Sequence, residues 1–167
     1  MKATLVLAAG LCLAASQKTV AACYGRADGV ERRFILDGGE AFDTKTGLTW
    51  QRCSLGMRWD SKEACAGEPM LASLDEAMRL AKEFGERWRV PSGPELESIV
   101  DRSCGRPVVD ETVFPDIRPN DEGTAEYWTT NPVGVAELFY YFDFMTGLAD
   151  GHSSGFHLAV RLVKTGR

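Results

Sequence analysis

The stretch Asp43–Cys53 reads DTKTGLTWQRC and decides the first part of the fold. Thr46–Gly47 is a turn signal, and the run LTWQR that follows it is β-prone, which predicts a strand. Gly47 is expected to take a positive φ in that turn. Two more β-prone runs, 33–36 and 41–43, precede the stretch and are separated by a Gly-Gly pair. The sequence therefore predicts a small antiparallel meander.

Two helices are predicted beyond the meander, and each begins with a capping box. Ser73 and Glu76 form the first box, and Gly85 ends that helix. Its apolar face is expected to consist of Leu74, Ala77, Met78, Ala81 and Phe84. Ser92 and Glu95 form the second box, which predicts a helix of about two or three turns.

The last part of the chain is rich in β-prone residues. Three runs predict strands there: 127–130, 135–144 and 156–163. The segment 150–155 is rich in Gly and Ser and is interpreted as a hairpin loop. We identify no internal repeat. Strands, two helices and then strands again indicate an α+β fold with a mostly antiparallel sheet.

The charge and length of the chain exclude some classes of function. The 167 residues include 24 acidic and 19 basic side chains, a net charge of −5. This acidic excess argues against binding to a nucleic-acid backbone, which selects for a basic face. Residues 23–167 have the length of a single domain with one core.

The amino terminus has the pattern of an export signal. Lys2 precedes thirteen uncharged residues, 3–15, which are too few to span a bilayer, and Val20–Ala22 fits a signal peptidase site. We therefore predict a signal peptide over 1–22 and an exported protein, periplasmic or extracellular, with no transmembrane span. The same segment with Cys23 also fits a lipobox, and the alternative is a lipoprotein anchored through that cysteine.

The cysteine count favours disulfides. Cleavage after Ala22 leaves Cys23, Cys53, Cys65 and Cys104, an even set in a compartment where disulfides persist. Three connectivities are possible. Cys53 and Cys65 flank one short loop and are the natural partners, which leaves Cys23 for Cys104. A catalytic thiol or a zinc site is disfavoured.

Four stretches occur in a characteristic order along the chain. They are Asp43–Cys53, Trp88–Leu96 (WRVPSGPEL), Tyr127–Thr130 (YWTT) and Val160–Val163 (VRLV). Together with the Cys53–Cys65 loop and Cys104, they resemble the Lcl C-terminal domain family, which is named for the carboxy-terminal domain of a Legionella collagen-like adhesin.

This resemblance implies a C-type-lectin-like fold, with two helices flanking a sheet whose last strands return beside the first. It implies no settled activity, because members of the family are mostly uncharacterised secreted or surface proteins of bacteria. We expect Trp50, Trp88 and Trp128 to pack in the core, each indole N–H donating to a buried carbonyl.

Residues with catalytic or metal-binding chemistry are few. Asp150, His152 and His157, with two serines between the histidines, superficially supply an acid, a base and a nucleophile. Only these two histidines exist, and no third ligand is spaced for a tetrahedral metal site. We predict no catalytic residue, no metal and no cofactor.

Calcium is a separate possibility. The acidic stretch 120–122 and Glu126 offer oxygen ligands. The sequence lacks the EF-hand order and the Glu-Pro-Asn, Gln-Pro-Asp and Trp-Asn-Asp motifs of true C-type lectins; Tyr127–Thr130 lies where the last motif is expected. Calcium-dependent sugar binding is therefore not predicted.

The resulting functional hypothesis is a non-enzymatic binding module of a bacterial envelope. It would recognise a protein, such as a pilus or envelope component, or a glycan, with a possible role in adhesion. The candidate ligand contacts are Tyr140, Tyr141, Asp150, His152 and, although primarily a core residue, Trp128. The alternatives are a cysteine enzyme similar to the formylglycine-generating group and a lipid-anchored structural envelope protein.

Overall fold

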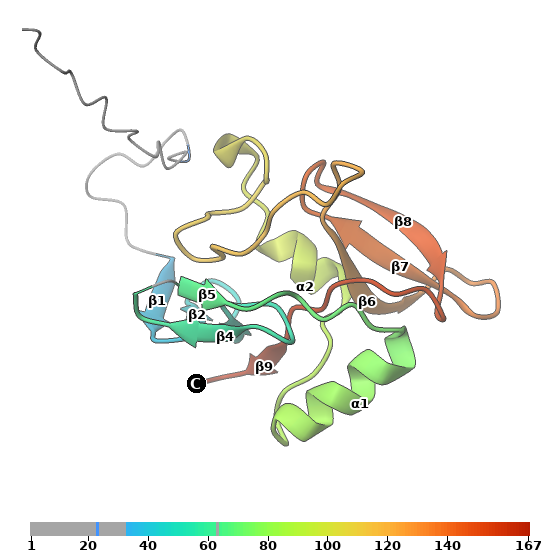
Figure 1. The fold of residues 1–167 in the computed structure, drawn as a ribbon, viewed down its shortest axis with the longest axis horizontal. Helices are drawn as coiled ribbons and strands as arrows, with labels where there is room; N and C mark the ends of the chain where they lie inside the picture. Colours follow the sequence, from blue (N-terminus) through green and yellow to red (C-terminus); the bar gives the residue numbers. More distant parts are fainter. Residues whose placement is uncertain (1–22, 24–32, 63) are drawn as a thin grey trace, which may run out of the picture.

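The structure is a computed structural model that describes residues 23, 33–62 and 64–167. The predicted signal peptide, 1–22, lies outside the described residues. The predicted meander is confirmed, and the last strand of the chain joins it (Figure 1). This antiparallel sheet has the order β1 (Phe34–Asp37), β2 (Glu40–Asp43), β3 (Leu48–Gln51) and β9 (Val163–Thr165).

A second antiparallel sheet lies at the other end of the molecule (Figure 1). Its strands, in order, are β6 (Glu126–Pro132), β7 (Leu138–Asp143) and β8 (Leu148–Ser153). A small hairpin is formed by β4 (Arg58–Asp60) and β5 (Ala64–Ala66). The α+β class with antiparallel sheets is therefore confirmed.

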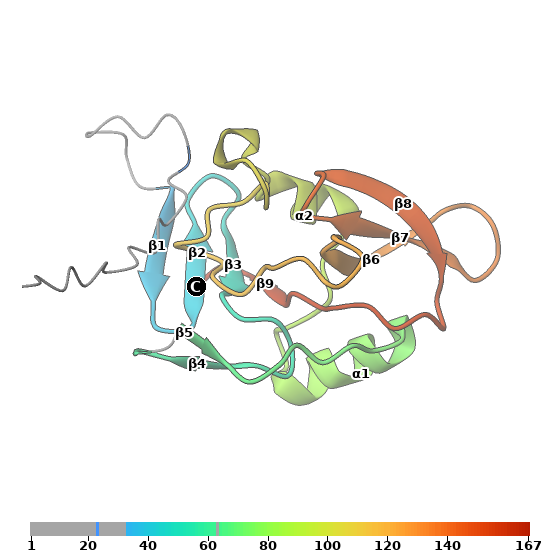
Figure 2. The same ribbon diagram turned by 45° about the horizontal axis from the view of Figure 1, so that its top comes forward.

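Both predicted helices begin at their capping boxes. In α1 (Leu74–Phe84) the Ser73 hydroxyl accepts from the Glu76 amide, while the Glu76 carboxylate accepts from the Ser73 amide. The second helix, α2 (Gly93–Ser98), has the equivalent box, and a 3₁₀ turn, η1 (Arg102–Cys104), follows it. The two helices lie on opposite sides of the C-terminal chain segment (Figure 2). Among the described residues, no helix combines the length and apolarity needed to cross a bilayer.

The apolar face of α1 is narrower than expected. Leu74, Ala77 and Ala81 are buried, but Met78 is 38% exposed and Phe84 is 49% exposed. Phe84 instead lies edge-on against Trp88, with ring centroids 5.8 Å apart, at the end of the helix.

Strand β6 divides the buried apolar residues into two clusters. Tyr127 belongs to a cluster with Trp50 and Phe142, whereas its neighbour Trp128 belongs to a cluster with Leu74. Successive residues of a strand point to opposite faces, so this division follows from the strand geometry. The indole of Trp128 donates to the Ala72 carbonyl at 2.8 Å, as expected.

The other two indoles behave differently. Trp50 is fully buried, but its Nε1 has no hydrogen-bond partner within the described part of the chain. Trp88 is half-buried, and the Lys164 ammonium lies 4.5 Å from the centre of its ring.

The chain contains a short repeat that our reading of the sequence missed. The six residues D-x-x-T-G-L occur at 43–48 and again at 143–148, and each links two antiparallel strands. In both, the aspartate accepts from the backbone amide two residues later and from the threonine hydroxyl three residues later. The glycine has φ 71° at Gly47 and 73° at Gly147. The two hairpin turns are therefore the same structure.

The predicted C-terminal strands are partly wrong. Strand β8 covers most of the segment interpreted as a loop, because the second D-x-x-T-G-L turn starts it. The run 156–163 is mostly not strand: it is buried from Leu158 to Val163 and pairs through isolated bridges to Ala72, Tyr127 and Arg89. The regular ladder begins only at Val163.

Two disulfides join Cys23 to Cys104 and Cys53 to Cys65, which confirms the predicted connectivity. The first links the amino-terminal end of the described chain to η1, and the second closes the loop that contains β4. Two disulfides fit a protein exported to an oxidising compartment.

The repeated turns provide a matched pair of substitutions. Gly47→Ala should lower the free energy of unfolding by about 1–2 kcal/mol, the cost of a side chain in the left-handed region. Gly147→Ala should cost about 1 kcal/mol more, because its Cβ would lie 3.1 Å from Arg102 Nη1 and 3.2 Å from Val108 Cγ2, whereas nothing lies within 4 Å at Gly47. Urea denaturation measures the free energy of unfolding of both variants. Equal decreases would show that Arg102 and Val108 move away from the new Cβ at little energetic cost.

Candidate functional site

The main candidate site is a groove of about 670 Å³. It is lined by residues from three segments that are far apart in the sequence: 65–71, 115–127 and 156–159, with Met57 beside the first. None of these segments is mainly regular structure, so the groove is built from loops held by the sheets beneath them.

The walls of the groove include exposed apolar side chains. Leu71 is 59% exposed and Phe156 is 49% exposed, and both line it. Three prolines, at 69, 115 and 119, stiffen the surrounding loops because each fixes its own φ. Exposed apolar side chains gathered around a concave surface are typical of an interaction site.

The basic side chains that line the groove each lie close to a carboxylate. Arg118 contacts Glu111 at 2.6 Å, and His157 lies 3.6 Å from Glu76. The remaining charged lining residues are carboxylates, and within the described part of the chain no ion pair joins Glu68, Glu122 or Glu126 to a cation. The groove is therefore acidic overall.

Glu126, at the start of β6, has a raised pKa. Burial raises the pKa of Glu126, and the nearby carboxylates of Asp143 and Glu122 raise it further, while His152 acts in the opposite direction. Its ionised form therefore lies in an environment that would be stabilised by a cation.

A buried ion pair holds one wall of the groove. Arg161 Nη2 donates to Asp116 Oδ1 at 2.6 Å, and both side chains are 0% exposed. Burial alone would raise the pKa of Asp116, but the Arg161 charge and donors from Ser54 outweigh it and hold that pKa below 3.8. The same carboxylate raises the pKa of Arg161 despite the burial of the guanidinium.

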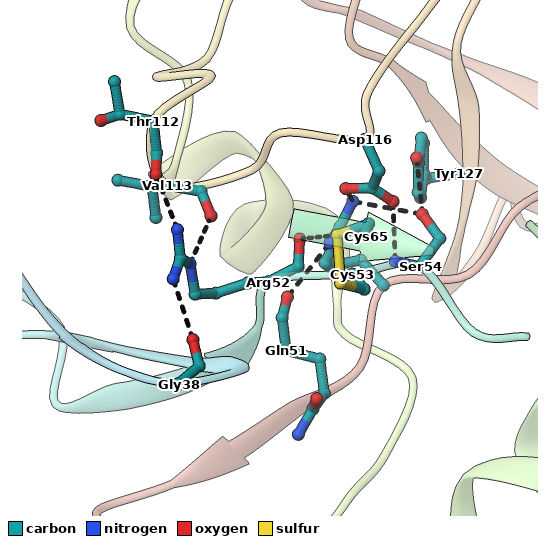
Figure 3. The surroundings of a disulfide bond; sticks show 11 residues. Gly38, Gln51, Arg52, Cys53, Ser54, Cys65, Thr112, Val113, Asp116 and Tyr127 are labelled. Atoms are coloured by element: carbon teal, nitrogen blue, oxygen red, sulfur yellow. Dashed lines mark hydrogen bonds and ion pairs between the residues drawn. A yellow bond between two sulfur atoms is a disulfide. The ribbon is translucent and has the colours of Figure 1, made fainter. Parts of the chain in front are cut away.

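Ser54 connects this pair to β6. Its amide donates to Asp116 Oδ2 at 2.7 Å, and its hydroxyl lies 2.8 Å from the Tyr127 hydroxyl (Figure 3). Arg161 also donates to the Ser54 hydroxyl and to the Gln51 carbonyl, while its Nε has no partner among the described residues. The network therefore ties the 115–119 wall to the chain after β3 and to the C-terminal segment.

Arg52 and the Cys53–Cys65 disulfide extend the support (Figure 3). The guanidinium of Arg52 donates to the carbonyls of Gly38, Thr112 and Val113, and it lies 3.7 Å from the centre of the Trp59 ring. Three acceptors in three directions match the donors of a guanidinium. The loop before the groove wall is thus fixed to the first sheet.

The predicted ligand residues lie on the β7–β8 hairpin, apart from Trp128. Tyr140 lies opposite Gly151, and Tyr141 lies opposite Asp150, so the two tyrosines point to opposite faces. Asp150 and His152 share the face of Tyr141. The prediction of Trp128 as a ligand contact is wrong, because its indole is fully buried against Ala72.

His152 connects this hairpin to the groove. Its ring stacks on that of Phe156 at a centroid distance of 3.7 Å, and the Tyr141 ring, on the neighbouring strand β7, lies 5.7 Å away. Phe156, His152 and Tyr141 therefore form an aromatic row that leads from the groove onto the second sheet.

The residues that superficially offered catalytic chemistry are dispersed. His152 stacks on Phe156, His157 faces Glu76, and Asp150 accepts from the Gly151 amide at 2.7 Å. Ser153, next to His152 along β8, points to the other face of the strand.

One group of potential metal ligands occurs among the described residues: Cys23, Asp101 and Cys104. The two sulfurs are bonded to each other, so they do not provide thiolates for a metal. Asp101 itself accepts from the Ser103 amide and hydroxyl as the cap of η1.

Sequence reasoning missed the groove residues Leu71, Phe156 and Glu126 as a unit. The sequence placed Phe156 in the predicted strand 156–163 and Glu126 among possible calcium ligands, and it gave no signal for Leu71. Their proximity depends on the Ala72–Leu158 bridge, which joins segments far apart in the sequence.

These features define the class of protein: a disulfide-bonded α+β domain with two antiparallel sheets and an acidic, partly apolar groove. The model of the Lcl C-terminal domain family matches residues 39–164, and the chain belongs to this family. No curated protein matches the chain in sequence.

The buried pair gives a prediction for stability. Asp116→Asn should lower the free energy of unfolding at pH 7 by about 3–5 kcal/mol, because Arg161 keeps its buried charge without a counter-charge. Asp121→Asn, an exposed position on the same wall, should change it by less than about 0.5 kcal/mol.

The effect of Asp116 should depend on pH. Because the folded pKa lies below the unfolded value, the stabilisation by Asp116 is complete above about pH 4 and is lost as the pH falls through the folded pKa. Urea denaturation between pH 2 and 7 should therefore show the wild type and Asp116→Asn converging in acid. A constant difference at every pH would contradict the electrostatic origin.

Proposed function

We propose that the protein is an exported, non-enzymatic binding module of a bacterial envelope and that its groove recognises a partner protein. The observation that supports this most is the groove itself: exposed Leu71 and Phe156 flank a concave surface whose walls are fixed by buried polar bonds. A rigid concave surface lowers the entropy cost of binding.

A C-type-lectin-like fold is part of this proposal. The last strand, β9, returns to pair with β3 of the first meander, and two helices pack beside the sheets. This topology agrees with the fold that the family resemblance implies. The groove is lined mainly by loops.

The alternatives fit the described residues less well. A cysteine enzyme of the formylglycine-generating type needs a free thiol, and the four cysteines of the described chain are joined in disulfides. A lipid on Cys23 would need the sulfur that bonds Cys104. Denatured, unreduced protein with two reactive thiols would favour the enzyme, and a diacylglyceryl adduct on Cys23 would favour the lipoprotein.

The proposal predicts a partner that can be captured at the groove. Oxidised protein carrying a photo-crosslinking residue at Leu71 should yield a discrete cross-linked envelope protein. The matched control carries it at Val135, an exposed apolar position outside the groove, and should not.

A glycan array beside this capture separates the two ligand classes. Binding on the array without a protein cross-link would show that the ligand is a glycan and not a protein. Binding in neither assay would contradict a binding module altogether.

A further inference from the structure

The charge of the groove indicates which kind of segment it accepts. Glu122 and Glu126 lie on one wall, and Glu68 lies on another. The basic residues nearby are engaged, Arg118 by Glu111 and His157 by Glu76. An occupant with a cationic side chain would therefore complement the groove, while an anionic one would be repelled.

The aromatic row adds a second feature suited to a cation. Tyr141 lies 5.7 Å from His152 by ring centroids, and burial raises the pKa of Tyr141, which the nearby carboxylates of Glu126, Asp150 and Asp143 raise further. Arg and Lys bind well where a carboxylate lies next to an aromatic face, since charge attraction and cation–π attraction then add.

The apolar side chains mark the other half of the groove. Leu71 and Phe156 lie on segments joined by the Ala72–Leu158 bridge, so their relative position is fixed by backbone hydrogen bonds of 3.0 and 3.1 Å. Leu71 is 59% exposed and Phe156 is 49% exposed, and a ligand that buried this area would gain about 25 cal/mol per Å².

We propose that the groove binds a segment of a partner protein in which Lys or Arg stands next to an apolar residue. The cation lies at Glu126 and Glu122, and the apolar side chain lies between Leu71 and Phe156. This inference rests on the proposed function and specifies its ligand. A sulfated glycan or an acidic peptide lacks the required charge.

Labelled peptides test the charge preference directly. The probes are two fluorescein-labelled peptides of about ten residues, one with a central Leu-Arg-Leu and the other with Leu-Glu-Leu. Fluorescence anisotropy with the oxidised protein should give at least about tenfold tighter binding of the Arg peptide at low salt. The preference should shrink in 0.5 M salt, because the charges are partly exposed.

Two variants locate the site. Glu126→Gln should weaken the binding of the Arg peptide by about threefold to tenfold. The affinity for the Glu peptide should stay unchanged or increase slightly. Glu97→Gln, an exposed position on α2 outside the groove, is the control and should have no effect. If the thermal unfolding of Glu126→Gln shows that it does not fold, Glu122→Gln replaces it with the same expected direction.

Equal binding of the two peptides would overturn this inference. So would binding of the Arg peptide that neither Glu126→Gln nor Glu122→Gln weakens. The proposed function fails separately. If the Leu71 cross-linker captures the same envelope protein equally well in the wild type and in Glu126→Gln, the protein is a binding module but its ligand is not a basic segment. If the wild type captures no protein, the proposed function itself fails.

Discussion

The ion pair between Arg161 and Asp116 is the constraint on which the rest of the interior depends. Both side chains are fully buried, and a buried charge is tolerated only where partners compensate for the lost water. Ser54 bonds both members of the pair, the Gln51 carbonyl accepts from Arg161, and Tyr127 on β6 lies within hydrogen-bond distance of the Ser54 hydroxyl. A buried pair of this kind contributes little net stability compared with apolar side chains of the same size, but an arrangement that separates the two charges is strongly disfavoured. The pair joins the groove wall at Asp116 to the C-terminal segment at Arg161.

Arg52, near the ion pair, holds the same groove wall by donating to backbone carbonyls. Arg52 donates to the carbonyls of Thr112 and Val113, just before Asp116, and it shares its strand end with Cys53. The segment from 105 to 125 contains no strand and no α-helix, and Arg52 adds to its local bonds, such as those from the Val113 and Phe114 amides to the Asp110 carbonyl. Local turns and the side chain of Arg52, which directly follows β3, together hold this long connection as one side of the groove.

Local signals explain what the sequence predicts well. Each capping box specifies its own partner three residues away, so the starts of α1 and α2 at Ser73 and Ser92 depend on little else. The first D-x-x-T-G-L turn was recognised through Thr46 and Gly47, whereas the second was obscured by the apolar residues 144 and 145 inside it. Alternation in 156–163 indicated a strand, but residues 158–163 are all buried and bridge three different segments, which a pattern of single residues does not reveal. The groove was unpredictable for the same reason, because its three walls meet only in the folded chain.

The rigidity of the groove bears on how it could function. A loop that orders only on binding subtracts its conformational entropy from the affinity, roughly 1–2 kcal/mol for each residue fixed. Here that ordering is already complete in the free protein, since prolines, the Arg161 network and the Cys53–Cys65 disulfide hold the walls. A modest groove can then bind a short segment with useful affinity, provided that its charge and apolar positions match. The same supports lie beneath the surface rather than on it, so the lining at Leu71, Glu126 and Phe156 can vary without loss of the fold. The residues that line the groove and the residues that hold its walls are therefore largely separate sets.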